Sequence, residues 1–206
     1  MVSSIKILSR ERFDCNVKEN GLKDNQAYIC VISTSDWYNK HILFDEPTEK
    51  RIILQFDDID LKGFACLRTC DDQVYYQHVD GVGPIIKPFN ELNAKYLFDY
   101  IDNNIDKSEW IIHCDTRFSR SAAIGLFISQ YLDYLQLKKS FYWVKNNVSE
   151  LRRYWFNHRI KDSYYIEFLL TYSFKKLPND KILHELYKEF KKRYGFYLQE
   201  IFDNQW

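Results

Sequence analysis

The stretch WIIHCDTRFSRS, residues 110–121, decides the fold that we expect for this chain. Its apolar start, Trp110 to His113, predicts a short buried strand. The residues after it, from about Ser121 to Leu135, are rich in Ala, Ile, Leu and Phe and predict a helix. A buried strand that leads through a tight loop into a helix is typical of α/β proteins.

The sequence on both sides of this stretch predicts further strands and helices. Strands alternate with helices early and helices dominate late, so we expect an α/β sheet with a helix-rich C-terminal half, in a single domain of residues 1–206. Residues 71–83 are ambiguous, because Val74 to Tyr76 suits a strand while Asp80-Gly81 suits a turn. The other predicted strands are Ile5 to Leu8, Ala27 to Ser33 and Arg51 to Ile59, and the other predicted helices are 90–104, 141–156, 164–172 and a last helix starting at 177–180.

The composition is ordinary for a globular protein. Hydrophobic residues make up 46%, and the formal net charge is zero, so the overall charge predicts neither a nucleic-acid nor a membrane partner. The apolar stretches are too short to span a bilayer, and no signal peptide is recognisable. The five cysteines, an odd number, suggest free thiols in a reducing, cytoplasmic compartment. Cys66 and Cys70 have no second pair of Cys or His to complete a zinc site, so we interpret them as two unrelated thiols. No cofactor is expected.

The residues from Cys114 to Arg120 carry the chemistry that the sequence predicts. A helix that begins directly after a strand points unpaired N–H groups at one spot, and successive N–H groups in such a loop form a nest for an anion. Thiols at the mouth of such loops are often thiolates at neutral pH. Arg120 can turn back to hold two phosphate oxygens with its planar guanidinium, and Ser121 can donate a hydrogen bond to the sulfur. The pattern therefore predicts a phosphate-binding loop with a nucleophilic cysteine.

These residues resemble the signature of the protein tyrosine and dual-specificity phosphatase superfamily, His-Cys-x5-Arg-Ser/Thr, at His113, Cys114, Arg120 and Ser121. The chain looks most like the small bacterial and phage members. They share a start like ILSRERF (residues 7–13), a strand ending FDDI (56–59) and a late Pro-Asn helix start (178–179). The resemblance implies a mainly parallel central sheet flanked by helices, a cysteinyl-phosphate intermediate and no metal.

The same resemblance implies roles for individual residues of the loop. Cys114 is the expected nucleophile, and Arg120 is expected to bind the phosphoryl oxygens and to stabilise the transition state. His113 is expected to orient the loop and tune the thiol. The residues expected to bind the substrate phosphate are His113, Asp115, Thr116, Arg117, Phe118, Ser119 and Ser121.

A general acid must protonate the leaving oxygen, and three aspartates are candidates. Asp58, which closes the FDDI strand, matches the family pattern best. Asp57 is its neighbour, and only one of the two can point inward if the strand continues. Asp80 is the rival, because Asp80 to Pro84 faintly resembles the Trp-Pro-Asp loop of the family.

The chain departs from the family pattern in two ways. Arg117 stands where the family usually has glycine, and residues 61–83 and 138–176 are extra relative to the small members. The second insert is expected to be helical, and basic side chains alternate there with aromatic ones. Such a surface suits a polyanionic substrate or RNA, or simply forms the solvated face of an amphipathic helix pair. Its basic residues are Lys138, Lys139, Lys145, Arg152, Arg153, Arg159 and Lys161.

Three functions are open on this basis. The first is a phosphoric monoester hydrolase, a protein tyrosine or dual-specificity phosphatase that acts on phosphorylated proteins. The second is a phosphatase of RNA 5′-ends, nucleotides or inositol phosphates, which the basic insert and Arg117 favour. The third is a catalytically weak pseudophosphatase that captures a phosphorylated ligand. Cys114 and Arg120 together favour an enzyme, because a domain that only binds has no need of the thiol.

Overall fold

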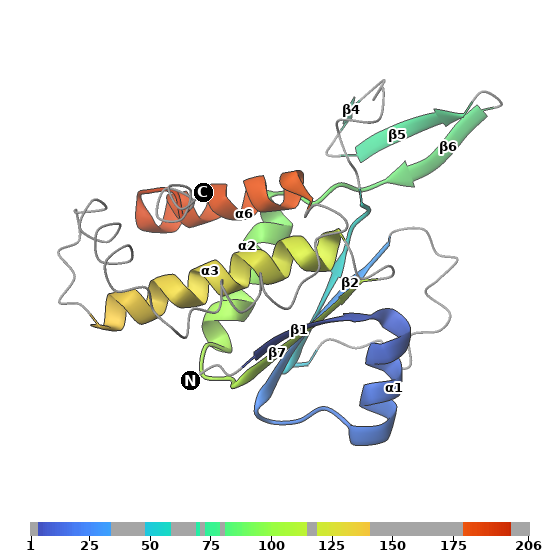
Figure 1. The fold of residues 1–206 in the computed structure, drawn as a ribbon. Helices are drawn as coiled ribbons and strands as arrows, with labels where there is room; N and C mark the ends of the chain where they lie inside the picture. Colours follow the sequence, from blue (N-terminus) through green and yellow to red (C-terminus); the bar gives the residue numbers. More distant parts are fainter. Residues whose placement is uncertain are drawn as a thin grey trace.

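The computed structural model describes residues 4–33, 48–58, 69–70, 73–78, 81–114, 119–140 and 179–198. Within these ranges the chain forms a four-stranded parallel sheet, a three-stranded antiparallel sheet and four helices (Figure 1). This arrangement confirms the predicted α/β class, the parallel central sheet and the helix-rich C-terminal half. The strands are β1 (Ser4–Ser9), β2 (Gln26–Ile32), β3 (Arg51–Gln55), β4 (Thr69–Cys70), β5 (Gln73–His78), β6 (Gly81–Ile86) and β7 (Glu109–Cys114), and the helices are α1 (Arg10–Asn20), α2 (Glu91–Asn103), α3 (Arg120–Ser140) and α6 (Asp180–Tyr194).

Strand β7 lies inside the larger sheet, whose order is β1-β7-β2-β3. Its residue Ile112 pairs with Ile7 of β1 on one side and with Ile29 of β2 on the other. Every residue of β2 is buried, as are all residues of β7 except Glu109, which is expected of parallel strands covered on both faces. Because these strands run the same way, the carboxyl ends of β7, β2 and β3 meet at one edge of the sheet, where α/β proteins bind their ligands.

Helices cover the two faces of this sheet unequally (Figure 1). Of the four described helices, only α1 lies on one face, where Phe13 and Val17 pack against Tyr28 and Ile111. Helices α2, α3 and α6 lie on the opposite face and enclose the main core. Because α3 lies between the sheet and α6, its residues 120–134 are buried with the exception of Leu126. Each large apolar side chain buried in this way stabilises the fold by roughly 1.5–3 kcal/mol.

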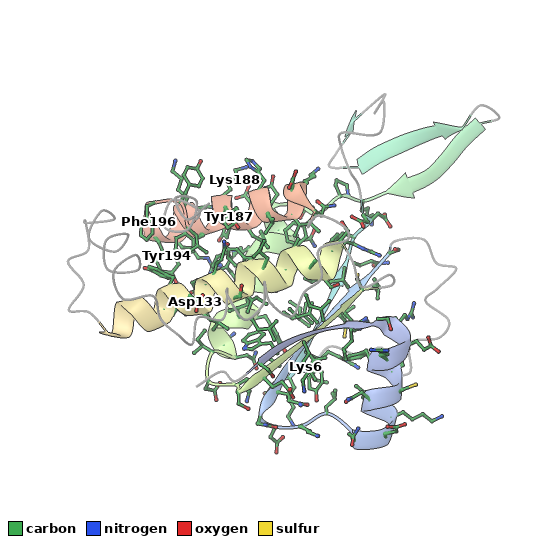
Figure 2. The ribbon with its side chains drawn as sticks, in the orientation of Figure 1. Lys6, Asp133, Tyr187, Lys188, Tyr194 and Phe196 are labelled. Atoms are coloured by element: carbon green, nitrogen blue, oxygen red, sulfur yellow. The ribbon has the colours of Figure 1, made fainter. Side chains whose placement is uncertain are left out.

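Aromatic side chains fill the space between α3 and α6. Figure 2 shows Tyr187 and Tyr194 between these two helices. The Tyr187 hydroxyl donates to Gln130 of α3 at 2.6 Å, and the hydroxyls of Tyr194 and Tyr131 lie 2.5 Å apart. The hydroxyl groups of buried tyrosines need such partners, and these bonds fix the position of α6 on α3.

The sequence determines where α2 and α6 begin and end. Asn90 and Asn93 form a reciprocal capping box at the start of α2, in which each side chain accepts a bond from the other residue's backbone N–H. Asn179 caps α6 by accepting bonds from the N–H groups of Lys181 and Ile182. Gly195 ends α6 with φ of 85°, a left-handed conformation that favours glycine. The last helix therefore begins where the sequence predicts it.

Helix α1 was not predicted from the sequence, although its signals are present. Ser9 caps the helix by accepting a bond from the N–H of Arg12, and Gly21 ends it with φ of 67°. Only Phe13 and Val17, one turn apart, are buried. Two buried positions in eleven residues give a hydrophobic pattern too weak to predict a helix.

The ambiguous segment 71–83 contains β5 and the start of β6. These strands pair antiparallel and project away from the rest of the molecule (Figure 1). Two hydrogen bonds between Asp57 and Lys87 join the two ends of this projection. The N–H of Asp57 donates to the Lys87 carbonyl at 2.7 Å, and the N–H of Lys87 donates to the Asp57 carboxylate at 2.9 Å. The small sheet therefore leaves and rejoins the core at nearly one point.

Within the described ranges, no helix is long and apolar enough to cross a membrane. The predicted helices 141–156 and 164–172, with most of the proposed insert 138–176, lie outside the described residues.

Candidate functional site

Cys114 ends the inner strand β7, at the edge where the carboxyl ends of β2 and β3 also lie. Helix α3 begins six residues later, at Arg120. The N–H groups of its first turn lack partners within the helix, and they carry the positive end of the helix dipole. The strand that ends at Cys114 and the helix that begins at Arg120 are therefore the two elements that the sequence predicts on either side of residues 115–118, which lie outside the described residues.

Ser121 lies beside the sulfur of Cys114. Its Oγ is 3.1 Å from the Cys114 Sγ, and both residues are fully buried. Either group can donate while the sulfur is a thiol, and only the hydroxyl can donate to a thiolate, which is the role that the sequence predicts for Ser121.

Arg120 is buried, with 3% of its surface exposed, and is held by the ends of two strands. Its Nη1 donates to the hydroxyl of Ser33, directly after β2, at 3.1 Å and to the carbonyl of Phe56, directly after β3, at 2.8 Å. The guanidinium is therefore fixed at the same edge of the sheet as Cys114. A buried guanidinium is a strong binding group for an anion, because the low-dielectric surroundings strengthen its charged hydrogen bonds.

Asp58 contacts the end of the Cys114–Arg120 segment. Its Oδ1 accepts a hydrogen bond from the Ser119 hydroxyl at 2.8 Å and a second from the Asn179 side-chain amide at 2.7 Å. The backbone N–H of Asn179 also lies 3.4 Å from the Ser119 carbonyl. Three segments that are distant in the sequence therefore meet at this carboxylate.

Asp57 lies in different surroundings from its neighbour. Its carboxylate accepts from the N–H of Lys87 and closes the base of the β5–β6 projection. Of the two adjacent aspartates, Asp58 is thus the one that contacts the candidate loop. Asp80 lies outside the described residues, and the residues after it, Gly81–Ile86, form β6.

His113 is buried and stacked on Phe13 of α1, with ring centroids 4.1 Å apart and an angle of 28° between the rings. Helix α1 therefore fixes the ring of the residue that precedes the cysteine. This contact could not be predicted from the sequence, because the prediction does not include α1.

Cys30, a second buried thiol, pairs with His113 across the β2–β7 ladder. Burial raises the pKa of Cys30 to about 12, so this thiol stays protonated at neutral pH. It lines a cavity of only about 10 Å³. Cys30 is therefore an inert core residue.

The remaining predicted site residues are only partly described. Asp115, Thr116, Arg117 and Phe118 lie outside the described residues. Ser121 contacts Cys114, Ser119 contacts Asp58, and Arg120 lies at the same edge of the sheet, whereas the ring of His113 lies on the α1 side of the sheet. Among the described residues, no group of three or more His, Cys, Asp or Glu side chains is placed to hold a metal ion. Ser33, which accepts from Arg120, and Asn179, which donates to Asp58, are not among the predicted site residues. The Pro178-Asn179 helix start was a signal for Asn179.

Known proteins do not identify this chain: no family model, curated protein or solved structure matches it significantly. The resemblance to cysteine-dependent phosphatases therefore rests on the motif residues and on their geometry. Membership of that superfamily stays a prediction.

Proposed function

We propose that this protein is a phosphoric monoester hydrolase of the protein tyrosine or dual-specificity type, acting through a cysteinyl-phosphate intermediate. One observation carries the proposal. The Sγ of Cys114, at the carboxyl end of an inner parallel strand, lies 3.1 Å from the hydroxyl of Ser121 in the first turn of α3. Arg120, between them in the chain, is buried at the same edge.

In the proposed reaction the thiolate of Cys114 attacks phosphorus, and the bond between phosphorus and the leaving oxygen breaks. Asp58 gives its proton to that oxygen. Water then attacks the phosphocysteine and returns its proton to Asp58, and the sulfur–phosphorus bond breaks. Inorganic phosphate leaves, and the thiolate is restored.

The contacts support this division of roles. Ser121 stabilises the sulfur, first as nucleophile and later as leaving group. Arg120, anchored on Ser33 and Phe56, requires little reorientation when charge moves to the phosphoryl oxygens, which is the condition for effective electrostatic stabilisation. Asn179 and Ser119 hold the carboxylate of Asp58 beside the loop.

The burial of Cys114 favours a second candidate, a domain that captures a phosphorylated ligand without turnover. The exposed fraction of Cys114 is 0%, and an enzyme needs its sulfur to be reached by phosphorus. A phospho-ligand-binding module would use Arg120 and the start of α3 and would leave the thiol idle.

A turnover assay without metal separates the two candidates. Substrates are an aryl phosphate, phosphopeptides, a 5′-phosphorylated RNA, nucleotides and inositol phosphates. We expect hydrolysis by the wild type, inhibition by vanadate, no activity in Cys114→Ser, and severe loss in Arg120→Lys because lysine cannot bind two oxygens with a planar fork. Cys15→Ser is the matched control, since Cys15 is an exposed cysteine on the opposite face of the sheet.

Activity that survives Cys114→Ser, or that depends on a divalent ion, would contradict the mechanism. Tight binding of a phosphopeptide without turnover, equal in wild type and Cys114→Ser, would favour the binding module. The substrate that is hydrolysed with the largest kcat/KM identifies the substrate class.

A further inference from the structure

A cleft of about 620 Å³ lies between the start of α2 and the exposed side of α6. None of the residues assigned above to the phosphate site lines it. Figure 2 shows Lys188, one of its lining residues, on the side of α6 that faces away from α3. The lining residues are Pro88, Asn90, Glu91, Leu92, Lys95, Lys181, Glu185, Lys188 and Lys192.

The cleft has more positive than negative side chains, because four lysines and two glutamates line it. The two glutamates are engaged by lysines: Lys192 lies 2.8 Å from Glu91, across the cleft, and Lys188 lies 3.9 Å from Glu185. Within the described ranges, Lys95 and Lys181 take part in no ion pair. Two lysine charges therefore remain uncompensated in the cleft.

The α2 wall also carries exposed apolar surface. Leu92, which lines the cleft, is 55% exposed, and Tyr96, one turn later on the same face of α2, is 54% exposed. The remaining large apolar side chains of the described core are buried or half-buried. Exposed apolar groups offer a bound chain a surface to pack on, and the lysines beside them are complementary in charge to carboxylates.

Each wall of the cleft is joined to the candidate active site by a short segment. On one wall, Asn179 binds the carboxylate of Asp58 and caps α6 through the N–H of Lys181, a cleft residue. On the other wall, Lys87 is bonded to Asp57, and Pro88, the next residue, lines the cleft. The cleft therefore adjoins the two segments that are bonded to Asp57 and Asp58.

We propose that this cleft binds an acidic segment of a phosphorylated protein, next to the phosphorylated residue in the substrate's sequence. The proposal rests on the proposed function and names the substrate class of the same site. The charge excess of the lysines favours carboxylate side chains. Glu91, Glu185 and the apolar groups of Leu92 and Tyr96 favour a peptide over RNA, whose evenly repeated phosphates would meet the two glutamates.

The test compares two peptides of the same length. One has Glu and Asp beside the position of the phosphorylated residue, and the other has Gln and Asn at the same places. Fluorescence anisotropy measures the binding of the unphosphorylated pair, and steady-state kinetics measures KM for the phosphorylated pair. The wild type should prefer the acidic peptide, and added salt should weaken that preference. The double variant Lys95→Glu/Lys181→Glu should weaken acidic-peptide binding about tenfold, since each exposed charge contributes a few-fold and is reversed. Lys18→Glu/Lys23→Glu, at two exposed lysines in and shortly after α1, is the charge-matched control and should keep the preference.

The outcomes separate the two proposals. Equal anisotropy binding of both unphosphorylated peptides by the wild type would overturn the cleft inference, whether or not the protein is a phosphatase. Lysine-dependent binding together with activity that survives Cys114→Ser would remove the proposed mechanism and leave the cleft as a peptide site. A single-stranded RNA that displaces the acidic peptide and binds more tightly through Lys95 and Lys181 would overturn the choice of a peptide.

Discussion

Asp57 and Asp58 are adjacent in the chain, yet the structure gives their carboxylates different tasks. Asp57 binds a backbone N–H at the base of the β5–β6 projection, and Asp58 binds Ser119, directly before α3, and Asn179. At the scale of single residues, the proposed chemistry therefore depends on one carboxylate and leaves its neighbour out.

We predict that Asp58→Asn slows hydrolysis of esters with poor leaving groups by about 10²–10⁴-fold, because no proton is then delivered to the leaving oxygen. An activated aryl phosphate should be affected less. Asp57→Asn is the control, because it keeps an acceptor for Lys87. Leaving-group dependence of kcat/KM is the measurement. Equal losses in the two variants would mean that Asp58 only supports the fold.

The two buried thiols should differ in reactivity. Because burial raises the pKa of Cys30 to about 12, its thiolate is scarce in the native protein, and iodoacetamide at pH 8 should not modify it. Exposed Cys15 should react. In the proposed enzyme Cys114 also reacts, and inorganic phosphate protects it. Peptide mass spectrometry after alkylation measures all three. If phosphate protects Cys15 equally, the protection is not specific.

The raised pKa of Cys30 also has a stability consequence. Unfolding returns the pKa to about 9.0, so between pH 9 and pH 12 the unfolded chain releases a proton that the folded chain keeps. The contribution of Cys30 to the free energy of unfolding is therefore full below pH 9 and falls as the pH rises toward 12.

At the scale of elements, the start of α6 combines two functions in Asn179. Its Oδ1 caps the helix, while its Nδ2 donates to Asp58. The two can be separated because one atom accepts hydrogen bonds and the other donates.

We predict that Asn179→Ala lowers the free energy of unfolding by about 1 kcal/mol through loss of the cap, and lowers turnover as well. Asn179→Asp keeps the cap acceptor and should stay near wild-type stability, but it sets a second carboxylate against Asp58, so turnover should fall. Urea unfolding and aryl phosphate kinetics give the two quantities. Wild-type turnover in Asn179→Asp would show that Asn179 acts on the helix alone.

The larger sheet was predictable from the sequence for a physical reason. Strands buried on both faces are continuous apolar runs, and β2 and β7 are such runs. The contacts within the candidate site were harder to predict from the sequence. Asp58 and Asn179 are 121 residues apart, and no local pattern encodes the bond between them. Likewise, the stacking of Phe13 on His113 depends on α1, whose buried face is only two residues wide.

At the scale of the whole molecule, strands β4 to β6 form a separate small sheet that projects from the core. Its chain leaves and rejoins at Asp57 and Lys87, whose backbone N and O atoms are 2.7 Å apart. A loop between fixed, adjacent ends can be shortened at small entropic cost.

We predict that replacing residues 60–85 by a short Gly-Ser linker changes the free energy of unfolding by less than about 1 kcal/mol. The deletion also removes Asp80, so the same variant tests the rival acid. If it hydrolyses esters with poor leaving groups as well as the wild type does, Asp80 is not the acid. A collapse of that activity, with circular dichroism and unfolding unchanged, would reverse the assignment to Asp58.

The position of β7 between β1 and β2 affects how the molecule is made. Ser4 and its partner Glu109 are 105 residues apart, so β1 and β2 leave the ribosome long before the strand that joins them. Until then the nascent chain presents apolar strands with unpaired edges, which is the kind of surface that chaperones bind. Strand β7 joins β1 to β2 and carries Cys114. A ribosome that stalls before residue 109 therefore releases a chain that has neither the complete sheet nor the candidate site.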